Sequence, residues 1–184
     1  MKRIVILASG SGSLAQSIFD ADFSSEGAEV VALICDKPGA HVLQRAEMRH
    51  IESYLIPMLA DRSVWNTELE GLIAALRPDL VVSAGFMRIL TDGFVAHYQG
   101  RLINIHPSLL PAFTGLNTHA RAIEAGCKFA GATVHRVTAE LDHGPILAQA
   151  VVPVLPDDTA DTLAARVLTQ EHLIYPKAVA ELLT

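Results

Sequence analysis

The chain has 184 residues, of which 51% are hydrophobic, 18% charged and 5% aromatic, and its net charge is −6. This apolar content excludes a disordered protein, and the negative charge, with Lys2-Arg3 as the longest basic run, argues against nucleic-acid binding. No apolar run approaches the roughly 20 residues that span a bilayer, and the N-terminus lacks the pattern of a signal peptide. We therefore expect no membrane partner and a cytoplasmic protein with Cys35 and Cys127 reduced.

Strand and helix patterns alternate along the first part of the chain. Buried, β-branched-rich strands are predicted at residues 3–8, 29–35, 53–56, 79–84 and 102–105, with helices between them at 11–21, 42–49, 61–76 and 92–98. This alternation is typical of a Rossmann-like α/β fold, a mostly parallel twisted sheet with helices on both faces.

The pattern changes after residue 105. A Pro-rich loop at 106–115 and a helix at 118–125 precede two strands, 132–137 and 146–154, whose spacing favours an antiparallel C-terminal pair. A final helix at 159–183 contains Pro176, which we expect to break or kink it. No linker is visible, so we predict a single domain over residues 1–184, with halves of about 1–100 and 101–184.

A glycine-rich loop, Ser9-Gly10-Ser11-Gly12-Ser13, follows the first predicted strand. Glycines allow backbone to approach a ligand closely, and free N–H groups at a helix start favour an anion. The segment also matches G-x-G-x-x-A through Ala15, and Asp36 lies where a dinucleotide fold places its ribose-binding acid. A phosphate-bearing ligand, a nicotinamide-binding oxidoreductase and a tight turn without a ligand all stay open.

The strongest chemical signal is Asn104-Ile105-His106-Pro107-Ser108-Leu109-Leu110-Pro111. Because side chains alternate along a strand, Asn104 and His106 share a face, at the strand end where open α/β sheets place their sites. An amide beside an imidazole offers an oxyanion donor and a proton-transfer group. Asp142 is the natural third member, since a carboxylate near His106 would orient its ring. The alternative is a structural Asn and a loop His.

This octapeptide closely resembles the signature of the folate-dependent formyltransferases. Residues 81–90, 134–145 and 169–176 resemble blocks of the branch that formylates glycinamide ribonucleotide in purine synthesis, and the likeness covers essentially the whole chain. From the chain length we expect none of the extra domains of the tRNA-acting and deformylating branches. A deformylase reaction, with water as the acceptor, stays the nearest alternative.

The resemblance implies transfer of a formyl group from 10-formyltetrahydrofolate, as co-substrate, to the amine of glycinamide ribonucleotide. Asn104 would donate to the developing oxyanion, His106 would act as general acid or charged donor, and Asp142 would favour the protonated ring and relay protons. Neither a metal nor a covalent intermediate is implied. The remaining histidines show no metal-ligand spacing, so we predict no metal site.

The resemblance also implies binding residues, with the phosphate in the N-terminal half. The ribonucleotide would contact Gly10, Ser11, Gly12, Ser13, Leu14, Pro107, Gln170 and Glu171. The formyl folate would contact Arg62, Met87, Arg88, Ile89, Leu90, Thr138, Ala139, Glu140 and Leu141, and His119 and His135 would lie just behind the site.

Some of these residues have plainer interpretations from the sequence alone. Glu171 could be an exposed helix charge, Arg62 a solvated helix-start residue and 86–90 part of the core. The family likeness further implies a cis Leu110-Pro111 bond. Leu14 stands where many relatives carry Asn, and His143 where a small residue is frequent. We expect a monomer or homodimer with small-molecule substrates.

Overall fold

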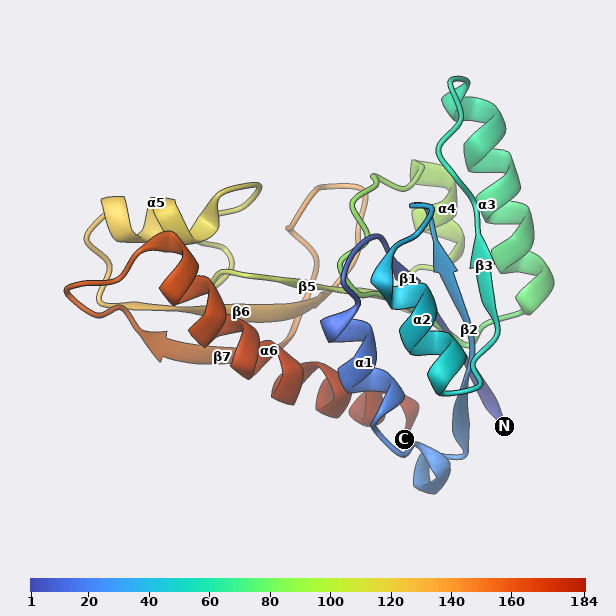
Figure 1. Ribbon diagram of the computed structural model, residues 1–184, viewed down its shortest axis with the longest axis horizontal. Coiled ribbons are helices and arrows are strands. Elements are labelled where there is room, and N and C mark those ends of the chain that lie inside the picture. Colours follow the sequence, from blue (N-terminus) through green and yellow to red (C-terminus); the bar gives the residue numbers. More distant parts are fainter.

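The fold is built on a seven-stranded sheet of order β3-β2-β1-β4-β5-β6-β7 (Figure 1). The computed structural model describes all residues from 1 to 184. The strands are β1 (Lys2–Ala8), β2 (Ala28–Cys35), β3 (Ser53–Leu55), β4 (Leu80–Ser83), β5 (Leu102–His106), β6 (Phe129–Arg136) and β7 (Ile146–Pro153). The first five run parallel, and β6 and β7 add antiparallel, which confirms the predicted Rossmann-like sheet with its C-terminal pair.

The helices cover both faces of the sheet. They are α1 (Ser13–Phe19), α2 (His41–Met48), α3 (Arg62–Leu76), α4 (Asp92–His97), α5 (Thr118–Glu124) and α6 (Ala160–Leu183), with a 3-10 turn at Ser24–Glu26. Figure 1 shows α1, α2 and α6 on one face, α3 and α4 on the other, and α5 over the β6–β7 end. No helix is long and apolar enough to cross a membrane.

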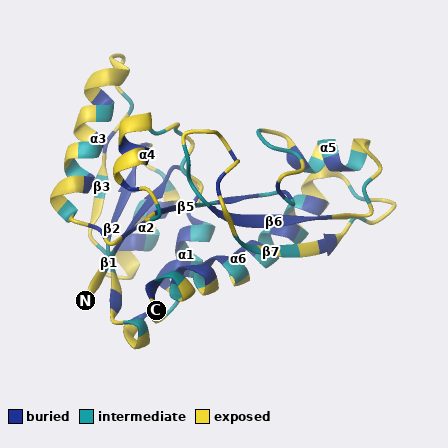
Figure 2. Cartoon of the chain, turned by 180° about the vertical axis from the view of Figure 1, so that it is seen from behind, coloured by how far each residue is buried: buried dark blue, intermediate teal, exposed yellow.

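Strand β1 shows how the sequence builds two cores from one sheet. Side chains alternate across a strand, so Ile4 and Ile6 pack in the cluster that contains α1, α2 and α6. Val5 and Leu7 point the other way, into the cluster with Trp65 and the rest of α3 and α4. All four β1 side chains are fully buried, and Figure 2 shows the central strands in the dark blue of buried residues, which explains the unbroken apolar run in the sequence.

Two sequence-based boundaries need correction. Strand β6 begins at Phe129, three residues before the predicted start, because 129–131 pair with Pro153, Val152 and Val151 of β7 and the Gly there hides the strand pattern. Helix α6 runs through Pro176 without breaking. The buried hydroxyl of Tyr175 donates to the Ser83 carbonyl at 2.6 Å, which fastens this part of α6 to the sheet.

Candidate active site

The carboxyl ends of β1, β4 and β5 meet at one edge of the sheet. Buried Ser9, which follows β1, donates its N–H to the Gly85 carbonyl at 3.2 Å. Its hydroxyl accepts from the Met87 N–H at 2.9 Å. These contacts hold the segment after β4 against the glycine loop after β1, next to the octapeptide that begins on β5.

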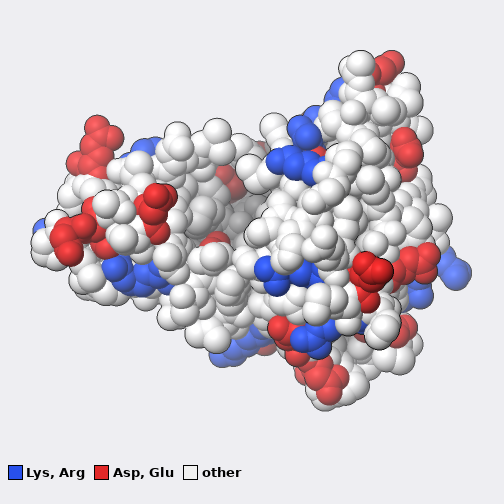
Figure 3. Space-filling view, viewed as in Figure 1, with Lys and Arg blue, Asp and Glu red and all other residues white.

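A cavity of about 630 Å³ opens at this edge, and Figure 3 shows the molecule hollowed there, with mostly uncharged walls. It brings together Leu14, Met87, Asn104, His106, Pro107, His119 and Glu171 from the predicted site. The remaining predicted residues, among them Gly10, Gln170, Arg62 and the 138–142 loop, do not line the cavity itself. A larger groove of about 710 Å³, between α2 and β3, holds none of the predicted residues.

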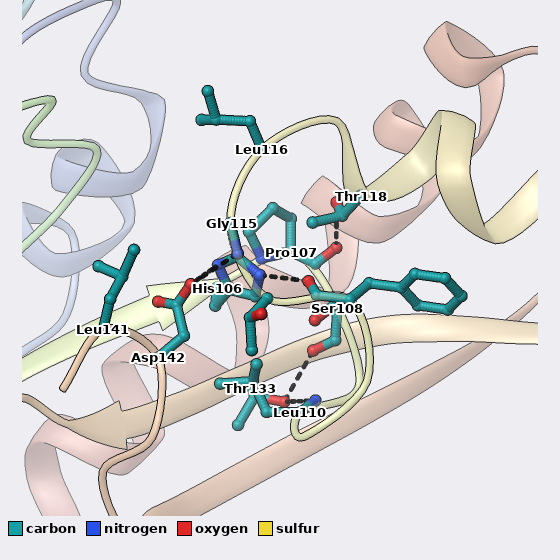
Figure 4. Close-up of polar contacts among 12 residues, drawn as sticks. His106, Pro107, Ser108, Leu110, Gly115, Leu116, Thr118, Thr133, Leu141 and Asp142 are labelled. Carbon is teal, nitrogen blue, oxygen red and sulfur yellow. Dashed lines mark hydrogen bonds and ion pairs between the residues drawn. The ribbon is translucent and has the colours of Figure 1, made fainter.

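His106 and Asp142 form a buried pair beside this cavity (Figure 4). Their side chains are 8% and 6% exposed, and Nδ1 of His106 lies 3.5 Å from Oδ2 of Asp142. Nε2 of His106 lies 2.8 Å from the Phe113 carbonyl, which can only accept, so Nε2 carries a proton. A doubly protonated ring would therefore satisfy both neighbours, with Nδ1–H directed at the carboxylate.

Two further histidines lie close to this pair, as the resemblance implies. His135 is buried with Nε2 3.9 Å from Oδ1 of Asp142, and its Nδ1 faces the Arg136 carbonyl at 3.2 Å. Burial lowers the pKa of His135, which favours the neutral ring, and the Arg136 carbonyl favours the tautomer with the proton on Nδ1. Burial, with a smaller contribution from His106, also lowers the pKa of His119. Any catalytic role for these two stays a prediction.

Glu171 is a buried carboxyl in the wall of the cavity, so its interpretation as an exposed helix charge is wrong. Burial alone raises its pKa to about 7. No Lys, Arg or His side chain of the chain forms an ion pair with Glu171. It is suited to pair with a positively charged or hydrogen-bond-donating ligand group, because that contact would replace the lost solvation.

The glycine loop turns sharply into α1. Gly12 has φ 78°, and a Cβ there would lie 2.4 Å from Cγ2 of Val42, so only glycine fits. No side chain caps the first turn of α1, which leaves its N–H groups free. Arg45 donates to the Ser11 carbonyl at 2.7 Å, and Nε2 of His172 lies 3.2 Å from Oγ of Ser13.

The segment after β4 presents apolar side chains to solvent. Met87 is 64% and Ile89 76% exposed, so the interpretation of 86–90 as core is wrong for these two. Arg62 stacks over the Trp65 ring at 4.7 Å and donates from Nη2 to the Ile89 carbonyl at 2.7 Å. Leu141, in the loop between β6 and β7, is 62% exposed. Met87 also lines the cavity, and exposed apolar side chains of this kind are typical of a ligand site.

Asp36 is already engaged within the chain. Its buried Oδ2 accepts from Nε of Arg88 at 2.5 Å. Its position at the end of β2 is where a nicotinamide-binding fold would place a ribose contact, but the burial and the arginine remove this carboxylate from a ligand. The position of Asp36, which motivated the oxidoreductase hypothesis, is therefore explained by its ion pair with Arg88.

The octapeptide is held by a buried threonine. Thr133 of β6 donates to the Ser108 carbonyl at 2.7 Å and accepts from the Leu110 N–H at 3.0 Å (Figure 4). Gln149 adds a contact to the Leu110 carbonyl at 2.9 Å. The Leu110-Pro111 bond is cis, as the family likeness implies. No group of three or more His, Cys, Asp or Glu side chains is arranged to hold a metal ion.

Residues 2–179 match the model of the formyl transferase family. The chain belongs to this family. It is 47% identical to the phosphoribosylglycinamide formyltransferase of Escherichia coli (strain K12), over 97% of this chain and 85% of that protein. It is 46% identical to the trifunctional purine biosynthetic protein adenosine-3 of Drosophila melanogaster, of which it spans only 14%. The crystal structure of the Brucella melitensis phosphoribosylglycinamide formyltransferase superposes with a TM-score of 0.92, at 45% identity, covering all of this chain and 96% of that one.

Several residues of this candidate site carry no signal of their role in the sequence pattern. Arg45, which contacts the glycine loop from α2, belongs to no motif, and His172, which contacts it from α6, lies in the block 169–176 without a pattern that indicates this contact. The Phe113 carbonyl and Gly115 N–H, which contact His106 and Asp142, are backbone groups. Only their position directly after the octapeptide could have drawn attention to them.

Proposed function

We propose that this chain transfers a formyl group from 10-formyltetrahydrofolate to the amine of glycinamide ribonucleotide, the reaction of purine biosynthesis for which its relatives are named. One observation carries the assignment of chemistry to residues. The buried His106–Asp142 pair lies beside Asn104 at the end of β5, next to a cavity large enough for small-molecule substrates.

Asn104 is the donor to the formyl oxygen, and His106 supplies positive charge beside it, because its two N–H groups are directed at the Phe113 carbonyl and at Asp142. Asn104 and His106 are two positions apart on β5, so their side chains share one face of the strand, and both line the cavity. Both can therefore stabilise the negative charge that develops when the amine attacks the formyl carbon. Removal of one such donor costs about 3 kcal/mol of transition-state stabilisation. The folate supplies the formyl group and leaves as the free amine. No metal is needed for this step.

Asp142 supports the charge of the imidazole and takes part in proton transfer. The carboxylate lies next to Nδ1 of His106 and is itself fixed by the Gly115 N–H at 2.9 Å. A positively charged ring between this carboxylate and the formyl oxygen matches the charge that develops in the reaction. The proton lost by the attacking amine passes, through this pair or through water, to the folate nitrogen as its bond to the formyl carbon breaks.

The ribonucleotide is assigned to the side of the cavity made by α1 and α6. Free N–H groups at the start of α1 suit a phosphate, with the backbone of Gly10–Leu14 as the cradle. Glu171 faces the cavity from α6 and suits a donor on the sugar or amine side of the ribonucleotide. Pro107 and Gln170 complete the proposed contacts.

The formyl folate is assigned to the opposite side, between residues 87–90 and 138–141. The exposed side chains of Met87, Ile89 and Leu141 would cover a flat pterin ring. Backbone N–H and C=O groups of both segments would form hydrogen bonds with the polar edge of the ring. Arg62 already lies against Ile89 and would reach a carboxylate of the folate tail. The donors and apolar surfaces present therefore fit this co-substrate.

An assay with and without the ribonucleotide tests this function. The purified chain should consume 10-formyltetrahydrofolate and formylate glycinamide ribonucleotide only when both are present. Release of free formate without the ribonucleotide would indicate the deformylase reaction instead. Micromolar binding of NAD with no response to a folate analogue would contradict the assignment. We expect the protein to act on these small molecules in the cytoplasm, as a monomer or homodimer.

A further inference from the structure

A single backbone turn contacts both members of the catalytic pair. Within residues 113–116, called here the 113–116 turn, the Phe113 carbonyl accepts from Nε2 of His106 at 2.8 Å. The Gly115 N–H donates to Oδ2 of Asp142 at 2.9 Å (Figure 4). Both contacts are made by backbone groups, so the directions of the imidazole and the carboxylate depend on the conformation of this turn.

That conformation is an uncommon one. Phe113 has φ 52° and Asn117 has φ 56°, in the left-handed region that residues with a Cβ rarely adopt, and Gly115 between them has φ 78°. Such backbone persists only where the surrounding contacts over-determine it. The turn therefore needs an external group that holds it in place.

Arg121 of α5 is this group. Its Nη1 donates to the Thr114 carbonyl at 2.6 Å and to the Leu116 carbonyl at 3.0 Å. Its guanidinium carbon lies 5.4 Å from the centroid of the Phe113 ring. The arginine thus takes the carbonyls of residues 114 and 116, while the groups of residues 113 and 115 remain directed at the catalytic pair.

The helix that carries the arginine is anchored to the same octapeptide. The buried Thr118, at the start of α5, donates from Oγ1 to the Pro107 carbonyl at 2.7 Å (Figure 4). Arg121 does not line the cavity, and both of its hydrogen bonds go to carbonyls of the turn, so it acts through the turn. The Thr118 contact to Pro107 fixes α5 against the octapeptide, and the Arg121 contacts fix the turn against α5. Together they define the position of the turn.

We propose that Arg121 is a positioning residue for formyl transfer, which sets the alignment of His106 with Asp142 through the 113–116 turn. This inference rests on the proposed function, because the alignment matters to the rate only if these two residues are catalytic. Small misplacements of catalytic groups cost up to about a hundredfold in rate.

A matched control exists elsewhere in the chain. Arg101 also donates to two carbonyls, those of Pro78 at 3.1 Å and His97 at 3.3 Å, and lies 4.9 Å from the Tyr98 ring centroid. These contacts are not part of the site. Arg121→Met and Arg101→Met therefore remove the same kinds of interaction, one beneath the catalytic pair and one remote from it.

In the formyl-transfer assay, Arg121→Met should lower kcat by about tenfold or more, with each KM changed less than about threefold. The midpoint of its pH profile of kcat should move, because the charge environment of the pair changes. Arg101→Met should keep the wild-type kcat and profile. Arg121→Lys should recover most of the rate, since one nitrogen makes both carbonyl contacts. Arg121→Gln serves as a second truncation if Arg121→Met does not fold.

Histidine-ring NMR gives a readout that does not need activity. The Nε2–H signal of His106, identified by its loss in His106→Ala, should exchange faster with solvent in Arg121→Met than in the wild type or Arg101→Met. If His106→Ala keeps full activity, the proposed function fails, while the NMR comparison still tests the positioning. If His106→Ala is inactive but Arg121→Met keeps the wild-type kcat, pH profile and exchange rate, the positioning role is wrong.

Discussion

Replacement of Glu171 by glutamine should stabilise the protein and weaken its substrate binding. Burial raises the pKa of this carboxyl to about 7 from an ordinary 4.5. Between these pH values the folded protein keeps a proton that the unfolded chain has lost, so stability falls as the pH rises through this window. At 1.36 kcal/mol per unit, the full cost above pH 7 is about 3 kcal/mol.

Glu171→Gln keeps the shape of the side chain and removes the charge. At pH 8 the variant should be more stable by up to about 3 kcal/mol, or roughly 6–12 °C in Tm, and the gain should vanish near pH 4.5. Thermal unfolding followed by circular dichroism from pH 4.5 to 8.5 measures this. Glu181→Gln, an exposed carboxyl of the same helix, is the control and should show no such pH-dependent gain.

The same variant should raise KM for the ribonucleotide, since the charge that costs stability is the one assigned to hold the substrate. A Glu171→Gln protein that is no more stable than the wild type at pH 8 would refute the reasoning. A stability difference that is constant across the whole pH range would refute it equally, because burial of a titrating carboxyl predicts a pH-dependent one.

Three further predictions concern the supports of the site. Thr133→Val should cost about 2–4 kcal/mol in denaturant unfolding, because it leaves a buried N–H and a carbonyl unpaired. The exposed Thr67→Val should stay within about 0.5 kcal/mol, and equal losses would contradict the argument. Gly12→Ala should lower Tm and weaken ribonucleotide binding, whereas Gly10→Ala, with open space for a Cβ, should keep the wild-type Tm. Arg62→Ala should raise KM for the folate about tenfold and leave KM for the ribonucleotide unchanged, and a rise in both would argue against its assignment.

The fold was largely predictable because its strands are buried on both faces. Such strands give unbroken apolar runs, as in β1, and the alternation with helices then determines the parallel order. The start of β6 was missed because pairing with β7 extends it through a glycine. The course of α6 through Pro176 was missed because packing against the sheet overrides the local preference of proline.

The site was predictable only in part. Asn104 and His106 belong to one strand, so period-two alternation alone indicates a shared face. The approach of Asp142 to His106 depends on a loop that returns to β5, so spacing alone only suggests it, and the family resemblance gives it more firmly. Glu171 is buried, and Arg121 donates to the 113–116 turn, because of tertiary packing. Such packing leaves no periodic or motif signal in the sequence.

The central claim is that the His106–Asp142 pair performs formyl transfer to the ribonucleotide. The most direct test is the steady-state rate of formylation of glycinamide ribonucleotide from 10-formyltetrahydrofolate by the wild type, His106→Ala and Asp142→Asn. We predict ribonucleotide-dependent turnover by the wild type and a loss of about 100-fold or more in each variant, with the fold retained. Full activity in both variants, or consumption of the folate at the same rate without the ribonucleotide, would contradict the account.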